Sequence, residues 1–312
     1  MRCKQKCADM EQGQADAPQN ETRGREKHLI VNGDDFGYSR EVNAGIIRAH
    51  REGILTSTSL MVADAARDEA AALAKENPQL DVGLHLVLCM GRSVLPATEI
   101  APLVDASGRF SNYPTLSGMR YFFTPGIRAR LKAECRAQIE LHLKLIGYLN
   151  HIDGHLNFHV HPAIAPVLIE LAHEYQVPCI RIPSEPTFTT LALSRERAAA
   201  KLLEAAIFRT LSRRARRMAA ERGIKSTDRL FGLHQTHHIT EEYVLGVMER
   251  MRDGLTEFYF HPAMDIGGTP PAPSSQIETE VLISAPVRDA IRSRGIELTT
   301  FRDIARRING KE

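Results

Sequence analysis

Two adjacent carboxylates follow an apolar run near the start of the chain. The run Leu29–Val31 is followed within a few residues by Asp34 and Asp35. A β-branched run closed by acidic residues is typical of a buried parallel strand, whose carboxyl end is where α/β folds bind ligands. One carboxylate can hold a cation while its neighbour transfers a proton, which suits metal-assisted hydrolysis. The alternative is an Asp-rich turn in which Ser39 begins a helix as its N-cap.

Histidines are concentrated in one short segment in the middle of the chain. Four of the thirteen histidines fall within the eleven residues His151–His161. If this segment is extended, every second residue lies on the same side, namely His151, Asp153, His155, Asn157, His159 and His161. Neutral imidazole is the commonest metal ligand, so the segment is a candidate metal site. The alternative is a polar loop whose histidines are only solvated.

A further histidine, His85, lies inside a predicted alternating strand over residues 81–88. Alternation places it on the opposite side from the apolar residues of that strand. Alone, it is more readily interpreted as a hydrogen-bonded core residue. Together with the aspartate pair and the histidine segment it completes an Asp/His/His set. Three protein ligands with open positions are typical of a catalytic metal site, and imidazole with carboxylate suits zinc and other divalent ions.

Two later strand ends offer groups that could assist. Arg181 lies among apolar residues at the end of a predicted strand over residues 177–182. A buried arginine needs an anion, either a catalytic carboxylate or a structural acid such as Glu185. His261 follows the predicted strand 256–260 and shares a face with Glu257. It is placed to act as a general acid, and the alternative is a core or surface histidine.

The elements that would position these residues alternate along the chain. Strand-like segments are expected at residues 29–31, 55–62, 81–88, 151–153, 177–182, 256–260 and 295–299. Helical patterns lie between them, at residues 42–53, 64–76, 127–148 and 162–175, and a last helix runs to residue 308. Strands separated by helices imply a parallel sheet with right-handed crossovers. Because polar residues recur at many successive strand ends, we expect a closed or partly closed (β/α) barrel and not an open doubly wound sheet.

Composition and charge restrict the functional classes. Forty Lys and Arg balance 38 Asp and Glu, so net charge predicts no nucleic-acid partner. No apolar run approaches the ~20 residues of a membrane span, and no secretory signal is visible. Residues 1–26 are polar and are predicted to be a disordered leader, and residues 27–312 are predicted to form the catalytic domain. Five scattered cysteines favour a reducing cytoplasm over a disulfide framework.

Four short motifs occur in a definite order along the chain. They are Asn32-Gly33-Asp34-Asp35-Phe36-Gly37, Gly83-Leu84-His85-Leu86, His151-Ile152-Asp153-Gly154-His155 and Phe260-His261-Pro262. Together they resemble the YdjC-like carbohydrate deacetylases, and the likeness spans about residues 28–308. The stretch His-Leu-Asn-Phe-His-Val-His-Pro is most similar to the subgroup associated with hopanoid biosynthesis.

The resemblance implies a distorted (β/α) barrel that is TIM-barrel-like and forms a single α/β domain. It implies a divalent metal ion, Zn²⁺ or Mg²⁺, held by Asp35, His85 and His155. It also implies that Asp34 is the general base and His261 the acid.

Two further points concern the residues around this site. The neighbouring polysaccharide deacetylase families suggest that Arg181 orients the base. The segment that contains His234, His237 and His238 is richer in histidine than the resemblance leads us to expect. Its role stays open.

The activity implied is hydrolysis of the N-acetyl group of an amino sugar, which yields acetate and a free amine. The hopanoid-associated likeness points to N-acetylglucosamine carried on a hopanoid lipid. One alternative is a glycosidase or phosphoesterase, although a glycosidase uses two carboxylates and needs no metal. A second is a catalytically silent carbohydrate-binding protein, against which the presence of Asp34 argues.

A basic segment bears on where the protein acts. Residues 195–222 contain nine Lys or Arg and three Glu. Helical periodicity places Arg209, Arg213 and Arg216 on one face and Leu203, Ile207, Leu211 and Met218 on the other.

The ordinary interpretation of this segment is a surface helix packed by its apolar side. The other is peripheral attachment to an anionic membrane, worth ~1 kcal/mol per basic residue. The aromatic segment Tyr121–Phe123 would then be a second contact, or else a lid over the active site. We therefore expect a cytoplasmic protein that can contact the inner membrane, with its oligomeric state left open.

Overall fold

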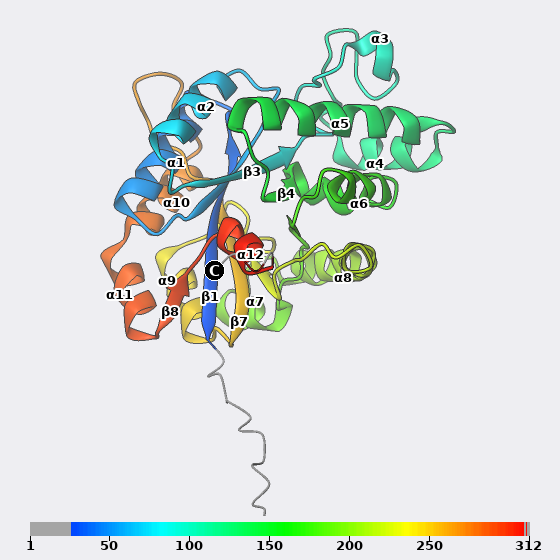
Figure 1. Cartoon of the computed structure of the whole chain (residues 1–312). Helices are drawn as coiled ribbons and strands as arrows, with labels where there is room; N and C mark the ends of the chain where they lie inside the picture. Colours follow the sequence, from blue (N-terminus) through cyan, green and yellow to red (C-terminus); the bar gives the residue numbers. More distant parts are fainter. Residues whose placement is uncertain (1–25, 309, 311–312) are drawn as a thin grey trace, which may run out of the picture.

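The computed structural model describes residues 26–308 and 310. Apart from residue 26, the predicted N-terminal leader lies outside the described residues, and so do Cys3 and Cys7. The described chain folds as one α/β unit in which a parallel sheet is surrounded by helices (Figure 1).

All strands of the described chain belong to one parallel sheet. They are β1 (Lys27–Phe36), β2 (Ser57–Leu60), β3 (Asp81–Leu86), β4 (His151–Gly154), β5 (Cys179–Ile180), β6 (Arg229–Phe231), β7 (Gly254–Phe260) and β8 (Ile296–Leu298). Their order across the sheet is β5-β4-β3-β2-β1-β7-β6, and β8 pairs with β1 off this path. Successive strands from β1 to β5 therefore lie side by side, as short crossovers predict.

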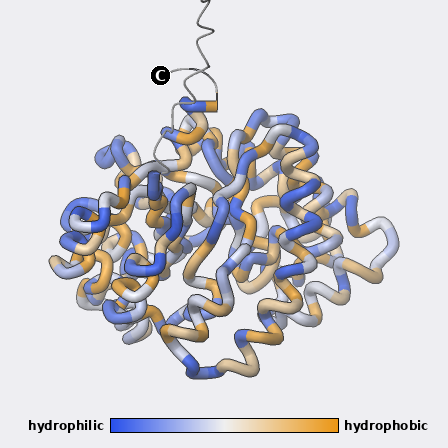
Figure 2. Tube along the Cα trace, turned by 90° about the horizontal axis from the view of Figure 1, so that it is seen from below, coloured by the Kyte–Doolittle hydropathy of each residue, from blue (hydrophilic) through white to orange (hydrophobic). Residues whose placement is uncertain are grey.

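The helices lie around this sheet. They are α1 (Arg40–Glu52), α2 (Arg67–Glu76), α3 (Ala97–Ile100), α4 (Pro114–Phe123), α5 (Ile127–Ile146), α6 (Ala165–Glu174), α7 (Thr187–Leu193), α8 (Ala198–Ala220), α9 (Glu241–Glu249), α10 (Pro273–Ile283), α11 (Ala285–Ser293) and α12 (Phe301–Ile308), with a 3₁₀ segment η1 (His155–Val160). In Figure 1, α1, α10 and α11 lie to the left of β1, and α5, α6 and α8 lie to its right. Seen from below, the helices form a ring around the strands, and hydrophilic and hydrophobic residues alternate along them (Figure 2).

The central strand β1 changes partners along its length, which curls the sheet. Its first residues, Lys27–Leu29, pair with both β8 and β7, and from Asn32 onward it pairs with β2. The segment just before β6 also approaches the other outer strand, β5, because Ile180 N donates to Lys225 O at 2.9 Å. The result is a curled half-barrel in a single domain, consistent with the predicted distorted barrel.

The sequence located most elements but misjudged several boundaries. Ser39 does begin α1 as its N-cap, with its side chain accepting from Val42 N. The segment at residues 91–125, for which no element was predicted, contains α3 and α4. The expectation of one extended face from His151 to His161 is wrong beyond Gly154, where η1 begins. Leu156 and Asn157 there have φ near +55° (56° and 53°), so the backbone cannot continue as a strand.

The prediction for the basic helix α8 also needs correction. Its buried residues are small or polar (Lys201, Ser212, Ala215 and Ala219). Leu203 and Ile207, which were expected to pack inward, are 65% and 51% exposed. Arg216 was predicted to share one face with Arg209 and Arg213. Its guanidinium is instead held by the segment before β6, because its Nη1 donates to Ser226 Oγ and Thr227 O. Among the described residues, no helix is long and apolar enough to cross a bilayer.

Candidate active site

The end of β1 turns both aspartates toward one site. Neighbouring side chains of a regular strand point to opposite faces. Between Gly33 and Phe36, however, the pairing with β2 shifts register, and Asp35 adopts a left-handed φ of 68°. One extra residue in a bulged strand re-aims a side chain, and strained non-glycine residues are typical of functional sites. The bulge explains how Asp34 and Asp35 both line one cavity.

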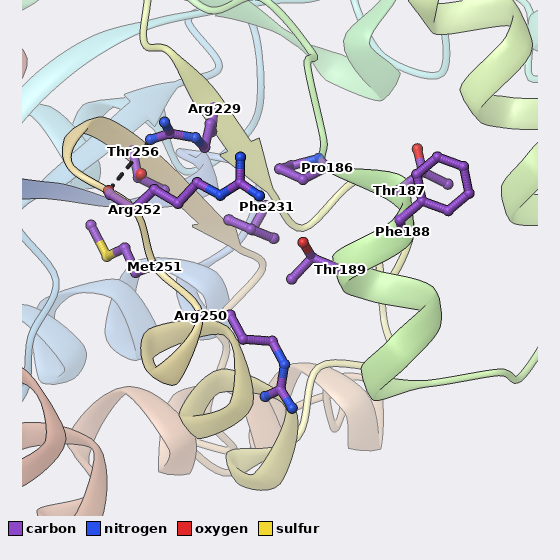
Figure 3. Close-up of a pocket in the computed structure, with 10 residues that line it drawn as sticks. All are labelled: Pro186, Thr187, Phe188, Thr189, Arg229, Phe231, Arg250, Met251, Arg252 and Thr256. Carbon is purple, nitrogen blue, oxygen red and sulfur yellow. Dashed lines mark hydrogen bonds between the residues drawn. The ribbon is translucent and has the colours of Figure 1, made fainter.

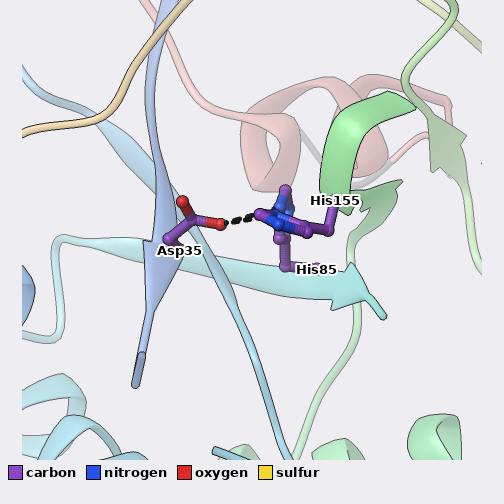
Figure 4. Close-up of side chains that lie close together, drawn as sticks. All are labelled: Asp35, His85 and His155. Atoms are coloured by element: carbon purple, nitrogen blue, oxygen red, sulfur yellow. Dashed lines mark hydrogen bonds and ion pairs between the residues drawn. The ribbon is translucent and has the colours of Figure 1, made fainter. Parts of the chain in front are cut away.

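Asp35 meets two histidines from separate strand ends (Figure 4). Its Oδ1 lies 3.1 Å from His85 Nε2 and 3.0 Å from His155 Nδ1. His85 comes from β3 and His155 directly follows β4. One ligand atom from each residue lies within 4.8 Å of the others. A carboxylate and two imidazoles so close together can ligate a divalent cation.

A buried carboxylate stands behind this group. Asp153, the cross-strand neighbour of His85, lies with its Oδ1 2.7 Å from His85 Nδ1. Burial lowers the pKa of His85, but Asp153 and Asp35 together raise it to about 10. Burial likewise raises the pKa of Asp35, yet the imidazoles of His155 and His85 hold it well below its usual range. The group is therefore set up to keep the carboxylates ionised.

Asp34 faces a different partner, the fully buried Arg181. Nη1 of Arg181 donates to Asp34 Oδ2 at 2.7 Å, and Nη2 donates to Oδ1 at 2.8 Å. Asn32 adds a third donor to Oδ1 at 2.8 Å. A bidentate guanidinium fixes both the position and the plane of a carboxylate. The arginine predicted from the apolar strand end thus pairs with the aspartate predicted to be the base.

The same guanidinium also contacts two further buried acids, neither of which is Glu185. Nη2 lies 2.9 Å from Asp153 Oδ2, and Nε donates to Glu257 Oε1 at 2.7 Å. Burial raises the pKa of Glu257 to about 7, against the opposing charge of Arg181. One cation therefore faces three buried carboxylates.

A cavity of about 340 Å³ opens over these groups. Its lining includes Asp34, Asp35 and His155 on one side and His261 after β7. Burial lowers the pKa of His261, while the charges of Asp35 and Asp34 oppose this shift. The volume falls within the usual range of small-molecule sites. The cavity brings the residues predicted to be base and acid, and two of the three predicted metal ligands, to one space. His85 contacts Asp35 but does not line the cavity.

A second hollow lies elsewhere, at the amino ends of β6 and β7 (Figure 3). Its volume is about 230 Å³, and its walls include Arg229, Arg250 and Arg252. Because Thr256 near the start of β7 also lines it, this hollow opens at the opposite end of the sheet from the aspartate pair. It is separate from the candidate active site.

A family model described as YdjC-like protein matches residues 28–293. The chain belongs to the YdjC-like family.

Curated relatives cover nearly the whole of the domain. A carbohydrate deacetylase of Brevibacillus brevis (strain 47) is 33% identical over 88% of this chain and 99% of its own length. A carbohydrate deacetylase of Geobacillus stearothermophilus is 30% identical over 89% of this chain and 98% of its own. A crystal structure from Enterococcus faecalis V583, provisionally described as a cellobiose-phosphate cleavage protein, superposes with a TM-score of 0.71 at 26% identity. It covers 89% of this chain and 99% of that one.

The structure of this YdjC-like protein adds site residues that sequence reasoning missed. Asp153 contacts His85 as its cross-strand neighbour; its sequence signal was its place on one side of the strand with His151 and His155. Asn157 Nδ2 and Thr236 Oγ1 lie 3.4 Å and 3.2 Å from the Tyr259 hydroxyl at the cavity wall. The left-handed turn of η1 that places Asn157 there has no periodic sequence signal.

The unexpected histidines of the segment after β6 have three different surroundings. His234 is buried, with its Nδ1 3.0 Å from Glu204 Oε2 of α8. His237 is exposed and lines the cavity, and its ring centroid lies 4.9 Å from that of His261. His238 is exposed.

Replacing Arg181 tests the electrostatic arrangement of the site. In Arg181→Met, three buried carboxylates lose their shared cation. Removing one partner of a buried ion pair costs about 3–5 kcal/mol. The free energy of unfolding, measured by urea denaturation at pH 7, should fall by that amount.

The control is Arg213→Met, at an exposed position of α8. This replacement should leave the urea midpoint nearly unchanged. A loss below about 1 kcal/mol in Arg181→Met would contradict the view that the guanidinium offsets the cost of burying these three carboxylates.

Proposed function

We propose that this protein is a metal-dependent hydrolase that removes the N-acetyl group of an amino sugar. The observation that supports the proposal most is that the two adjacent aspartates contact different partners. Asp35 meets two imidazoles, whereas Asp34 is held by Arg181 beside them, and both line one cavity. The names of the two long curated relatives support a sugar deacetylase.

Asp35, His85 and His155 would hold the divalent ion, Zn²⁺ or Mg²⁺. The donor set fits such an ion, because a metal-bound histidine normally donates its other ring N–H to a carboxylate. Asp153 lies in that position behind His85. When bound, the ion would supply Lewis-acid chemistry to the acyl carbonyl and make water more acidic.

Asp34 would accept the proton of the attacking water. The bidentate contact with Arg181 and the bond from Asn32 hold its carboxylate in one orientation. A general base must be positioned within hydrogen-bond reach of the proton that it takes. Arg181 is therefore a positioning residue in this proposal.

His261 would donate a proton to the departing amine. It lines the same cavity as Asp34. A lowered pKa makes its imidazolium a stronger acid once it is protonated. The products are acetate and the free amino sugar.

The geometry supports this reaction over the alternatives weighed from the sequence. A retaining or inverting glycosidase needs two carboxyl groups on opposite sides of a sugar bond. Here Asp34 is engaged by a guanidinium and Asp35 by two imidazoles. A silent carbohydrate-binding protein has no need of a carboxylate held in this way.

We further propose that the sugar is carried on a lipid, with a hopanoid-linked N-acetylglucosamine as the natural substrate, and that the protein contacts the inner membrane from the cytoplasm. Exposed apolar side chains on α7 and α8 support this, among them Phe188, Leu202, Leu203 and Ile207. Phe188 and Leu202 share a hollow with Arg209 and Arg213.

Phe122 and Phe123 of α4 are also exposed, and Phe122 shares a second hollow with Arg214 of α8. Tyr121 instead is buried, with its hydroxyl donating to Leu88 O.

Replacing Asp34 should lower the reaction rate alone, whereas replacing Asp35 should also remove the metal ion. We expect the wild type to release acetate and a primary amine from an N-acetylglucosamine oligosaccharide, and a chelator to abolish this. Asp34→Asn should keep the metal but lose roughly 10²–10⁴ in rate, the usual contribution of a general base. Asp35→Asn should lose metal and activity together. Metal content by mass spectrometry and acetate release measure the two effects.

Asp265→Asn, at an exposed aspartate after β7, is the matched control and should change neither quantity. Equal loss of metal in the Asp34 and Asp35 variants would make them joint ligands and place the base elsewhere. Chelator-insensitive cleavage of the sugar–sugar bond with the acetyl group retained would instead indicate a glycosidase.

The lipid proposal predicts salt-sensitive binding to anionic vesicles. Exposed charges are screened beyond ~8 Å at physiological ionic strength, so binding should weaken as salt is added. The double variant Arg209→Glu/Arg213→Glu should no longer sediment with vesicles. It should lose activity on vesicle-embedded N-acetylglucosamine lipid but keep activity on a soluble sugar.

Arg292→Glu/Arg294→Glu on the distant α11 makes the same change of charge and should still bind vesicles. If the wild type prefers the soluble sugar and does not sediment at low salt, the substrate is an ordinary soluble amino sugar.

A further inference from the structure

A second group of potential ligands lies on the other side of His261. It consists of His237, His261 and Glu278, which offer one ligand atom each within 4.8 Å of one another. The three residues come from the turn after β6, the end of β7 and helix α10. None of them belongs to the Asp35, His85 and His155 group.

Glu278 is a buried carboxylate whose charge is poorly compensated. Its side chain is fully buried, and its Oε2 accepts from the backbone N–H of His261. Its Oε1 has no hydrogen-bond partner. Burial raises the pKa of Glu278 to about 8, and the nearby charges of Asp34 and Asp35 act in the same direction. Among the described residues, no Lys or Arg forms an ion pair with it.

His261 presents an unpaired nitrogen to the same space. Its Nδ1 is buried without a hydrogen-bond partner and lies 4.0 Å from Glu278 Oε2. Buried polar atoms normally have partners. The unpaired Nδ1 of His261 and the unpaired Oε1 of Glu278 belong to side chains that approach within 4.0 Å, so one shared partner would satisfy both. A cation that accepts electron pairs from the imidazole nitrogen and from the carboxylate oxygen is such a partner.

His237 supplies the third donor. Its ring centroid lies 4.9 Å from that of His261, and its backbone has a left-handed φ of 62°. A non-glycine residue in this conformation is uncommon, and it holds the imidazole at the cavity edge. Two imidazoles and one carboxylate form a donor set that suits zinc.

We propose that His237, His261 and Glu278 form a second, inhibitory site for a transition-metal cation such as Zn²⁺. An ion bound to His261 would occupy the ring that otherwise donates a proton, so excess zinc would block turnover. The inhibitory consequence rests on the proposed acid role of His261, whereas the binding itself does not. The site also gives the histidine-rich segment after β6 a function.

The test counts ions on the full-length protein. Metal-free protein is dialysed against Zn²⁺, and bound zinc is measured by mass spectrometry. The wild type should bind two ions per chain, and His237→Ala and Glu278→Gln should each bind one. His238→Ala, the exposed neighbouring histidine, is the matched control and should bind two. Excess Zn²⁺ should inhibit acetate release by the wild type, and the inhibitory concentration should rise at least tenfold in His237→Ala.

The same count separates this proposal from the function proposed above. Asp35→Asn should retain one ion, held by the second site, and Asp35→Asn/His237→Ala should bind none. One ion in the wild type, still one in His237→Ala and none in Asp35→Asn would overturn the second site and leave the first intact. One ion that survives Asp35→Asn but is lost in His237→Ala would support the second site and overturn the first.

Discussion

The buried contact between Arg181 and Asp34 is the interaction on which the rest of the site depends. From the end of β5, one guanidinium reaches Asp34 on β1, Asp153 on β4 and Glu257 on β7. It therefore ties an outer strand of the half-barrel to three others. Removing such charges from water costs several kcal/mol per ion, which only good geometry and further hydrogen bonds can offset. The bidentate bond and the donor from Asn32 provide that geometry.

The arrangement separates two chemically identical side chains. Asp34 and Asp35 are neighbours in sequence, and a bulge with a left-handed Asp35 directs them to different partners. Asp34 contacts the permanently charged Arg181, whereas Asp35 contacts two imidazoles that can bind a metal ion together with it. Asp153 links the two halves, because one of its oxygens contacts His85 and the other lies near Arg181. A change at Asp153 should therefore be felt in both halves.

The sequence predicted those parts of the fold and site that depend on periodicity. Alternation in β3 correctly separated His85 from its apolar neighbours, and apolar runs located most strands. The structure also brings Asp35, His85 and His155 together, as the motifs implied. Features set by single backbone conformations were missed, because they leave no repeating pattern. The bulge at Asp35 and the turn at Leu156 and Asn157 are of this kind. Burial of α8 was misjudged in part: Leu211 and Met218 do pack against the core, but Leu203 and Ile207 are exposed. The fully buried positions of α8 include the small Ala215 and Ala219.

The central claim is that a metal ion binds Asp35, His85 and His155 while Arg181 keeps Asp34 off the metal. Anomalous diffraction at the zinc edge, from crystals soaked with less than one equivalent of Zn²⁺, tests it most directly. The account predicts one strong peak within about 2.0–2.2 Å of one atom of each of the three ligands. Asp34 should remain paired with Arg181. A peak coordinated by Asp34, or one that lies away from His85 and His155, would contradict the account.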